Sequence, residues 1–263
     1  MVSWITKNIL NKFYIHPLSY ILLLLLILTG SFKETLIVFF IIIVHESGHL
    51  LSSKIFKWKL DKIVIYPFGG CVKFNEDINR PILEEIIIII SGPLFQMILF
   101  FLITIIYNKY YISPKDYLIF KNYHYTLLIF NLLPIYPLDG GKLFNAINNY
   151  FFPYKKGNII STIISIIILV TISITYNKPN FLTIASIILF EQILYIKRQG
   201  YLYNKFLLER YIKKYNFKKI KIIKNKNNMY RDKKHVILNN NKYITEREYL
   251  TKRFGKKIWK KPL

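Results

Sequence analysis

The stretch TLIVFFIIIVHESGHLL, residues 35–51, decides how this chain folds. An apolar run leads into the pattern His45-Glu46-Ser47-Gly48-His49, and two leucines follow it directly. Imidazole and carboxylate groups are costly to place in a lipid bilayer, and they occur there when they have partners and a function. The stretch therefore predicts a membrane-spanning helix that carries a chemical site.

The spacing within this pattern favours a metal site. Residues four apart on an α-helix differ by about 40° around its axis, so His45 and His49 project from one face and can hold one Zn²⁺. Glu46 is rotated by about 100° from His45, which suits a carboxylate that moves protons. Gly48 leaves room for another backbone or a substrate strand to approach closely. The alternative is a histidine that merely packs in a core, and two histidines with a glutamate in hydrocarbon disfavour it.

The stretch NLLPIYPLDGG, residues 131–141, offers a third ligand. Pro134, Pro137 and two glycines interrupt an apolar segment, and irregular backbone at membrane depth lines cavities and sites. Asp139 could supply a carboxylate ligand, and Asn131 an amide that donates hydrogen bonds. The alternatives are a helix–helix hydrogen bond for Asn131 and a surface turn for Asp139. The spacing alone decides neither case.

Other apolar runs of similar length surround these two segments. The chain has 263 residues, of which 53% are hydrophobic, and a bilayer core requires roughly 20 apolar residues per helix. The first run follows Lys7 and Lys12 as a secretory signal would, but no small-residue cleavage site follows, so we interpret it as a retained helix. The sequence predicts a membrane α-helical fold, a polytopic bundle of about six transmembrane helices. The predicted spans are Tyr14–Ser31, Thr35–Ser53, Ile86–Tyr107, Tyr123–Asp139, Asn158–Tyr176 and Phe181–Ile196.

Lysines beside the predicted spans indicate the topology. The net charge is +24, and basic groups follow the second, fourth and sixth spans, beginning near Lys54, Lys155 and Lys197. Cytoplasmic loops carry an excess of Lys and Arg, so we expect both termini to face the cytoplasm. Because Lys54 follows His49 closely, the metal site should lie near that side. We expect the charge to attract anionic lipid rather than nucleic acid, because no base-reading module is present.

The sequence predicts a small basic domain at the C-terminal end of the chain. We divide the chain into a membrane domain, residues 1–196, and a basic cytosolic region, residues 197–263. Leu202–Phe217 is expected to be a basic amphipathic helix, Phe217–Ile223 and Lys234–Leu238 short strands, and Thr245–Phe254 a helix capped by Thr245. Glu191 and Gln192, a polar pair in the last span, could contact the site, gate access, or lie near the interface; the sequence leaves this open.

Together the two motifs resemble the site-2 protease family of intramembrane zinc metalloproteases, peptidase family M50. An HExxH in an early membrane helix is followed about 90 residues later by an Asn…Pro-x-Asp-Gly segment, and the resemblance covers residues 1–196. The sequence of this second segment is most similar to that of the family members that act in sporulation. The resemblance implies that His45, His49 and Asp139 are zinc ligands, that Glu46 is catalytic, and that Asn131 assists the substrate carbonyl or its oxyanion.

The resemblance also implies a place for the substrate. Gly69-Gly70, within Ile63–Phe74, resembles a membrane-associated β-hairpin that receives an extended substrate segment, and alternating residues independently favour a hairpin. The segment broken by Pro134 and Pro137 would provide further backbone partners. Ser91-Gly92-Pro93 resembles the family's small-Gly-Pro element, after which many relatives carry Asn where this chain has Gln96. The single cysteine, Cys71, permits no intramolecular disulfide and is expected to be an apolar filler.

We therefore expect a zinc metalloendopeptidase that performs regulated intramembrane proteolysis. The resemblance implies cleavage of the precursor of sigma factor K during sporulation, at the outer forespore membrane facing the mother-cell cytoplasm, with inhibitory membrane proteins as partners. The alternative substrate is another membrane-tethered regulator of the anti-sigma type. A transporter would not need HExxH, and an inactive homologue would have lost a ligand or the glutamate.

The tail has two open interpretations. In the first, this tail (residues 197–263) is a single reduced copy of the nucleotide-responsive CBS-type domain that the relatives carry in this place, and it binds ATP. A basic docking segment for an acidic or disordered part of the substrate is the other. A homo-oligomer is possible, and the sequence does not specify one.

Overall fold

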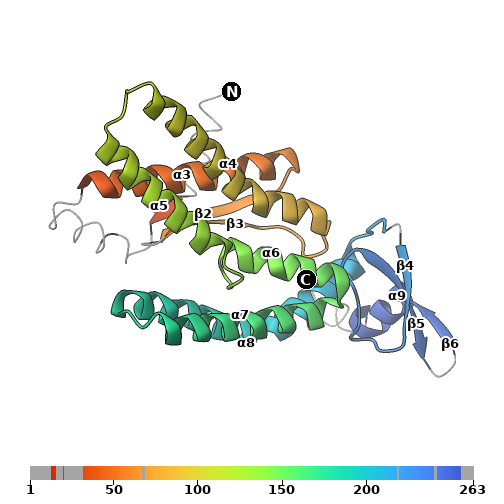
Figure 1. Cartoon of the computed structure of the whole chain (residues 1–263). Coiled ribbons are helices and arrows are strands. Elements are labelled where there is room, and N and C mark those ends of the chain that lie inside the picture. Colours follow the sequence, from red (N-terminus) through yellow and green to blue (C-terminus); the bar gives the residue numbers. More distant parts are fainter. Residues whose placement is uncertain are drawn as a thin grey trace. The chain divides into compact units, whose positions relative to one another are not determined.

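The computed structural model describes residues 13–15, 20, 32–66, 69–217, 219–239 and 242–255. The chain divides into two compact units, which are described one at a time. The first comprises Met1–Glu76 and Ile87–Leu132, and the second comprises Asp77–Ile86 and Leu133–Leu263. Figure 1 labels most of the helices and strands of both.

Among the described residues, three helices and a small sheet make up the first unit. The helices are α3 (Phe32–Ile55), α4 (Ile82–Asn108, in this unit from Ile87 onward) and α5 (Pro114–Leu132). Ile41 of α3, Leu99 of α4 and Phe120 of α5 form a buried apolar cluster between them. The helix that carries the HExxH pattern is thus held on two sides by neighbouring helices.

In the described part of the chain, three helices are long and apolar enough to cross a membrane: α3, α4 and α7 (Tyr154–Thr175). At about 1.5 Å per residue, 22 to 27 residues reach across a hydrocarbon core of about 30 Å. Their outer faces expose large apolar side chains such as Phe40, Ile43 and Phe101. So much exposed apolar surface is unusual for a soluble monomer and suits contact with lipid.

The predicted number of six spans is not confirmed. The second and third spans fall within α3 and α4, and the fifth matches α7 except for its last residue, Tyr176. The first span lies almost entirely outside the described residues, and its Tyr14 belongs to a strand. The bounds of the fourth span were wrong, because α5 ends at Leu132 and a new helix begins at Asp139. The prolines between them end the first helix, as expected of residues that cannot continue one.

The sheet of the first unit has the order β1-β2-β3, with β1 (Phe13–Ile15) parallel to β2 (Leu60–Tyr66) and β2 antiparallel to β3 (Gly69–Phe74). The predicted hairpin is confirmed: Gly69 pairs with Tyr66, so Gly69-Gly70 begins its second strand. The side chain of Cys71 lies outside those described. Within the described residues, β3 is an edge strand.

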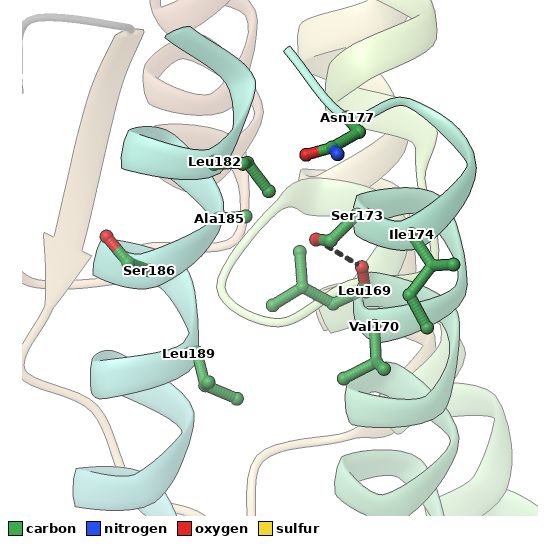
Figure 2. A pocket seen from close by; sticks show the side chains of 9 residues that line it. All are labelled: Leu169, Val170, Ser173, Ile174, Asn177, Leu182, Ala185, Ser186 and Leu189. Carbon is green, nitrogen blue, oxygen red and sulfur yellow. Dashed lines mark hydrogen bonds between the residues drawn. The ribbon is translucent and has the colours of Figure 1, made fainter. Parts of the chain in front are cut away.

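The second unit begins with three helices, α6 (Asp139–Phe151), α7 and α8 (Pro179–Ile212). α7 and α8 lie side by side (Figure 1). Near the connection between them, a pocket of about 460 Å³ separates the two helices (Figure 2). Ser173, on its wall, donates to the carbonyl of Leu169 at 2.7 Å, so this hydroxyl is satisfied within its own helix. The lining is otherwise mostly apolar: Leu169, Val170, Ser173, Ile174, Asn177, Leu182, Ala185, Ser186 and Leu189.

The tail folds as a small α/β module. A sheet of order β4-β5-β6 is formed by Lys219–Ile223, Lys233–Asn239 and Lys242–Thr245, with β4 parallel to β5 and β6 antiparallel to it. α9 (Glu246–Leu250) and a π-helical turn (Thr251–Gly255) follow. Both predicted strands and the Thr245 cap, which accepts from the Glu248 amide at 3.2 Å, are confirmed. β6 was not predicted.

The predicted amphipathic helix at Leu202–Phe217 is not a separate element. α8 continues from the sixth predicted span to Ile212, through the expected boundary at residue 196. Its last turns supply Tyr203, Phe206 and Leu207 to the buried core of the tail. The apolar residues of this stretch therefore pack on the rest of the tail and form part of its core.

Arg210, near the end of α8, organises the polar interior of this module. Its Nε donates to Glu246 Oε1 at 2.6 Å, and its Nη1 donates to the carbonyls of Tyr230 and Arg231 at 3.1 and 2.9 Å. Burial alone would raise the pKa of Glu246, but hydrogen bonds from His235 and Arg210 hold it at about 2. The Glu246 carboxylate therefore remains charged at neutral pH and needs its partners.

We expect Arg210→Met to destabilise the tail by about 3–5 kcal/mol, because it removes the charged partner of a buried carboxylate, which keeps only its contacts to His235, and leaves two carbonyls without this donor. At 1.36 kcal/mol per tenfold, the β5 amides should exchange with deuterium at least ~100-fold faster. The measurement is hydrogen–deuterium exchange on the full chain in detergent. Arg247→Met, at an exposed position, removes the same charge and should change exchange little. Unchanged exchange in Arg210→Met would contradict the assignment.

Candidate metal centre

The two histidines of the HExxH pattern lie one turn apart on α3, as predicted. Both are buried, and their Nε2 atoms are 3.2 Å apart. In a tetrahedral site with zinc–nitrogen bonds of about 2.0–2.1 Å, two ligand nitrogens lie about 3.3 Å from each other. The spacing of the two rings therefore fits a single zinc ion.

The outer nitrogens of both rings face hydrogen-bond partners. His49 Nδ1 lies 2.8 Å from the carbonyl oxygen of Ile88, and His45 Nδ1 lies 3.0 Å from Oε1 of Gln96, both on α4. A carbonyl oxygen only accepts, so His49 carries its proton on Nδ1 and presents the Nε2 lone pair. Metal-binding histidines are generally held in this way.

Gly92 provides the space in front of the two Nε2 atoms. A Cβ at this position would lie 2.3 Å from His49 Nε2 and 2.9 Å from His45 Nε2. Gly48 has the matching role on α3, since its Cβ would lie 2.4 Å from the carbonyl oxygen of Ser91. The predicted close approach of a backbone at Gly48 is confirmed, and the partner is the Ser-Gly-Pro element of α4.

Glu46 faces a small cavity beside this pair. The cavity has a volume of about 10 Å³, and its lining includes His45, Glu46, Gln96 and Asn131. That volume is about what one water molecule requires. Glu46 Oε2 is buried and has no hydrogen-bond partner among the described residues. The structure thus brings a carboxylate, a histidine and the predicted amide of Asn131 around a space the size of one water.

Asp139 belongs to the second unit, where it is the first residue of α6. It is buried, and its Oδ1 lies 3.1 Å from Nζ of Lys142. The loop before it has a cis peptide between Tyr136 and Pro137. The predicted interruption of the helix in this segment is confirmed, because Leu133–Leu138 is not helical. Pro134 lies within the interruption, as predicted.

The irregular backbone before Asp139 is satisfied by α7 and α8. The amide of Tyr136 donates to Ser165 Oγ at 2.8 Å, and Gln192 Nε2 donates to the carbonyl of Tyr136 at 2.8 Å. Gly141 packs against the same loop, with Ile135 backbone only 2.3 Å from where its Cβ would lie. Gln192, whose role the sequence left open, thus supports this loop, a role that was not among the predicted alternatives.

Gln96 was the main residue that sequence reasoning did not assign. It had two signals: many relatives carry Asn at this place, and Gln96 lies four residues after Gly92, and therefore on the same face of α4. Gly69 and Gly70 are the first two residues of β3. Whether these glycines and the two prolines contact a substrate stays a prediction.

Comparisons with known proteins agree with this geometry. Residues 34–121 match the model of peptidase family M50. The chain is 31% identical to stage IV sporulation protein FB of Bacillus subtilis (strain 168) over 219 residues, 80% of this chain and 74% of that protein. It is 30% identical to a zinc metalloprotease of Methanocaldococcus jannaschii over 46% of this chain and 36% of that protein.

A solved structure shares the fold. The site-2 protease from Methanocaldococcus jannaschii matches with a TM-score of 0.55 at 22% identity, covering 69% of this chain and 89% of that one. This likeness concerns the fold alone. The assignment of individual residues depends on the geometry described above.

Proposed function

Because this chain belongs to peptidase family M50, the site-2 proteases, and is a metalloendopeptidase, we propose that it cleaves a membrane-tethered protein within or beside the bilayer. The observation that carries the proposal is the pair of Nε2 atoms 3.2 Å apart, each on a ring whose Nδ1 is already engaged. Lone pairs in such proximity favour a shared cation. The three apolar helices support placement in a membrane.

His45, His49 and Asp139 would hold one zinc ion. Each of the three is buried and offers one ligand atom of a type that zinc binds. A catalytic zinc has three protein ligands and one open position, and the two histidines leave one ligand to be supplied. Asp139 is the carboxylate of the Pro-x-Asp-Gly segment, and the loop contacts to Ser165 and Gln192 keep its helix start in a defined conformation.

Glu46 would be the proton-transfer group. When bound, zinc polarises the scissile carbonyl and lowers the pKa of a water molecule beside it. Glu46 Oε2, which has no hydrogen-bond partner among the described residues and lies next to a cavity the size of one water, would accept the proton of the attacking water and return it to the leaving amine. Asn131 lines the same cavity and donates to the developing oxyanion, a role worth about 2.7–4 kcal/mol per donor in other hydrolases.

The substrate would bind as an extended strand. A transmembrane helix hides its peptide bonds in hydrogen-bonded turns, so local unwinding precedes cleavage, and an edge strand can pair with the unwound segment. β3 begins at Gly69-Gly70 and forms such an edge among the described residues. The backbone of the loop that contains Pro134 and Pro137 offers a second surface.

We propose the precursor of sigma factor K as the substrate, at the outer forespore membrane with both termini of the enzyme in the cytoplasm. Similarity to a stage IV sporulation protein over 80% of the chain supports this. Inhibitory membrane partners, a homo-oligomer and binding of ATP by the tail stay predictions. Another membrane-tethered regulator of the anti-sigma type is the second candidate.

Co-expression separates these substrates. The full chain is produced together with the tethered sigma-factor precursor, or with a tethered anti-sigma factor, and the products are followed by immunoblot. We expect cleavage of the precursor by the wild type and none by the Glu46→Gln variant. Cleavage of the anti-sigma factor alone would overturn the substrate while leaving the protease assignment intact.

A further inference from the structure

Gln96 is a completely buried amide in the middle of α4. A primary amide in such a place requires partners for both of its ends. Its Nε2 donates to the backbone carbonyl of His124 on α5 at 2.9 Å, and its Oε1 lies 3.0 Å from His45 Nδ1 on α3. One side chain thus connects three helices of the first unit.

These two contacts fix the orientation of the amide. The His124 carbonyl can only accept, so the NH₂ group of Gln96 must face it, and Oε1 must face His45. Oε1 in turn can only accept, so His45 carries its proton on Nδ1. A neutral His45 ring therefore presents an Nε2 lone pair toward His49, whose Nδ1 donates to the Ile88 carbonyl.

Without this constraint the pair has another stable arrangement. The neutral ring of His45 could carry its proton on Nε2 and donate it to His49 Nε2, only 3.2 Å away. That hydrogen bond would occupy the two lone pairs on which metal binding depends. Gln96 excludes it, because a ring without Nδ1–H would face the Gln96 oxygen with a second lone pair.

We propose that Gln96 is a positioning residue that commits His45 to the tautomer able to bind zinc. The inference rests on the proposed metal site and assigns to Gln96 a role in how that site is prepared. It concerns the chain before metal binds, so it can be tested without cleavage.

The first test measures zinc affinity of the purified full chain in detergent by competition with a chelator. Gln96→Leu, which has a similar size and no acceptor, should bind zinc about 10–100-fold more weakly. Gln96→Glu keeps an acceptor for Nδ1–H and should bind at least as tightly as the wild type. Met97→Leu, at the neighbouring and half-exposed position, is the matched control and should be unchanged.

The second test reads the tautomer directly. In metal-free wild-type protein with ¹⁵N-labelled histidine, His45 should show a protonated Nδ1 and an unprotonated Nε2, and Gln96→Leu should lose this preference. A role in holding α4 to α5 alone would leave the tautomer unmoved. This measurement on the wild type remains decisive if Gln96→Leu does not fold.

Three results would overturn the proposal: zinc affinity in Gln96→Leu within twofold of wild type, affinity in Gln96→Glu as weak as in Gln96→Leu, or a wild-type His45 protonated on Nε2. Failure of the metal site itself is distinguishable, because then the wild type would also bind no zinc. In that case the affinity comparison has no wild-type value, and the tautomer of His45 in the wild type decides the proposal.

Discussion

Glu46→Gln should abolish cleavage while the protein keeps its zinc. The amide has nearly the shape of the carboxylate, so the helix and both histidines remain in place, but it cannot accept a proton from water. Positioned proton transfer contributes about 10²–10⁴-fold to rate, and Glu46 would act in both directions. We expect cleavage to fall at least ~100-fold in a co-expression assay and in a purified assay with a tethered substrate.

The control for this prediction lies on the same helix. Glu34→Gln, in the first turn of α3, makes the same chemical change away from the histidines and should cleave normally. Zinc content should equal that of the wild type in both variants. If Glu46→Gln retained a tenth or more of wild-type cleavage, Glu46 would not be the proton-transfer group.

Gly92→Ala should eliminate zinc binding with little damage to the helix that contains it. Alanine favours helix more than glycine does by about 0.8–1 kcal/mol, so α4 itself should persist. The added Cβ would lie 2.3 Å from His49 Nε2 and 2.9 Å from His45 Nε2. Both rings would have to turn away and lose their Nδ1 partners. We expect zinc affinity to fall at least ~100-fold, the loss that corresponds to about 2.7 kcal/mol.

Chelator competition and thermal unfolding check this result together. Gly200→Ala on α8 is the matched control, because among the described residues nothing outside its own stretch of helix lies within 4 Å of its added Cβ. It should bind zinc normally and unfold at the same or a slightly higher temperature. Wild-type zinc affinity in Gly92→Ala would mean that the two Nε2 atoms do not form the binding site.

Local patterns in the sequence predicted what depends on local periodicity. The turn-by-turn alignment of His45 and His49 follows from helix geometry, the hairpin from alternation, and the cap at Thr245 from its hydroxyl. Features that depend on long-range packing were missed or misplaced. The pairing of Phe13–Ile15 with β2 joins residues 50 apart in sequence and has no local signal.

The broken fourth span shows the same limit. Pro134 and Pro137 indicated a break, yet not that α5 begins at Pro114 or that Asp139 begins a new helix. Gln96 and Gln192 are amides in apolar helices, and their partners, His45 and the Tyr136 carbonyl, lie on other elements. Helix packing determines which group such an amide binds. The sequence of a single helix therefore does not identify the partner.

The zinc content of the purified chain tests the central claim most directly. We predict about one zinc ion per chain in the wild type and in Glu46→Gln, and close to none in His45→Ala, His49→Ala or Asp139→Ala, measured by elemental mass spectrometry on folded protein of known concentration. A wild type without zinc after purification in zinc-containing buffer, or an Asp139→Ala variant that retains a full equivalent with unchanged affinity, would contradict it.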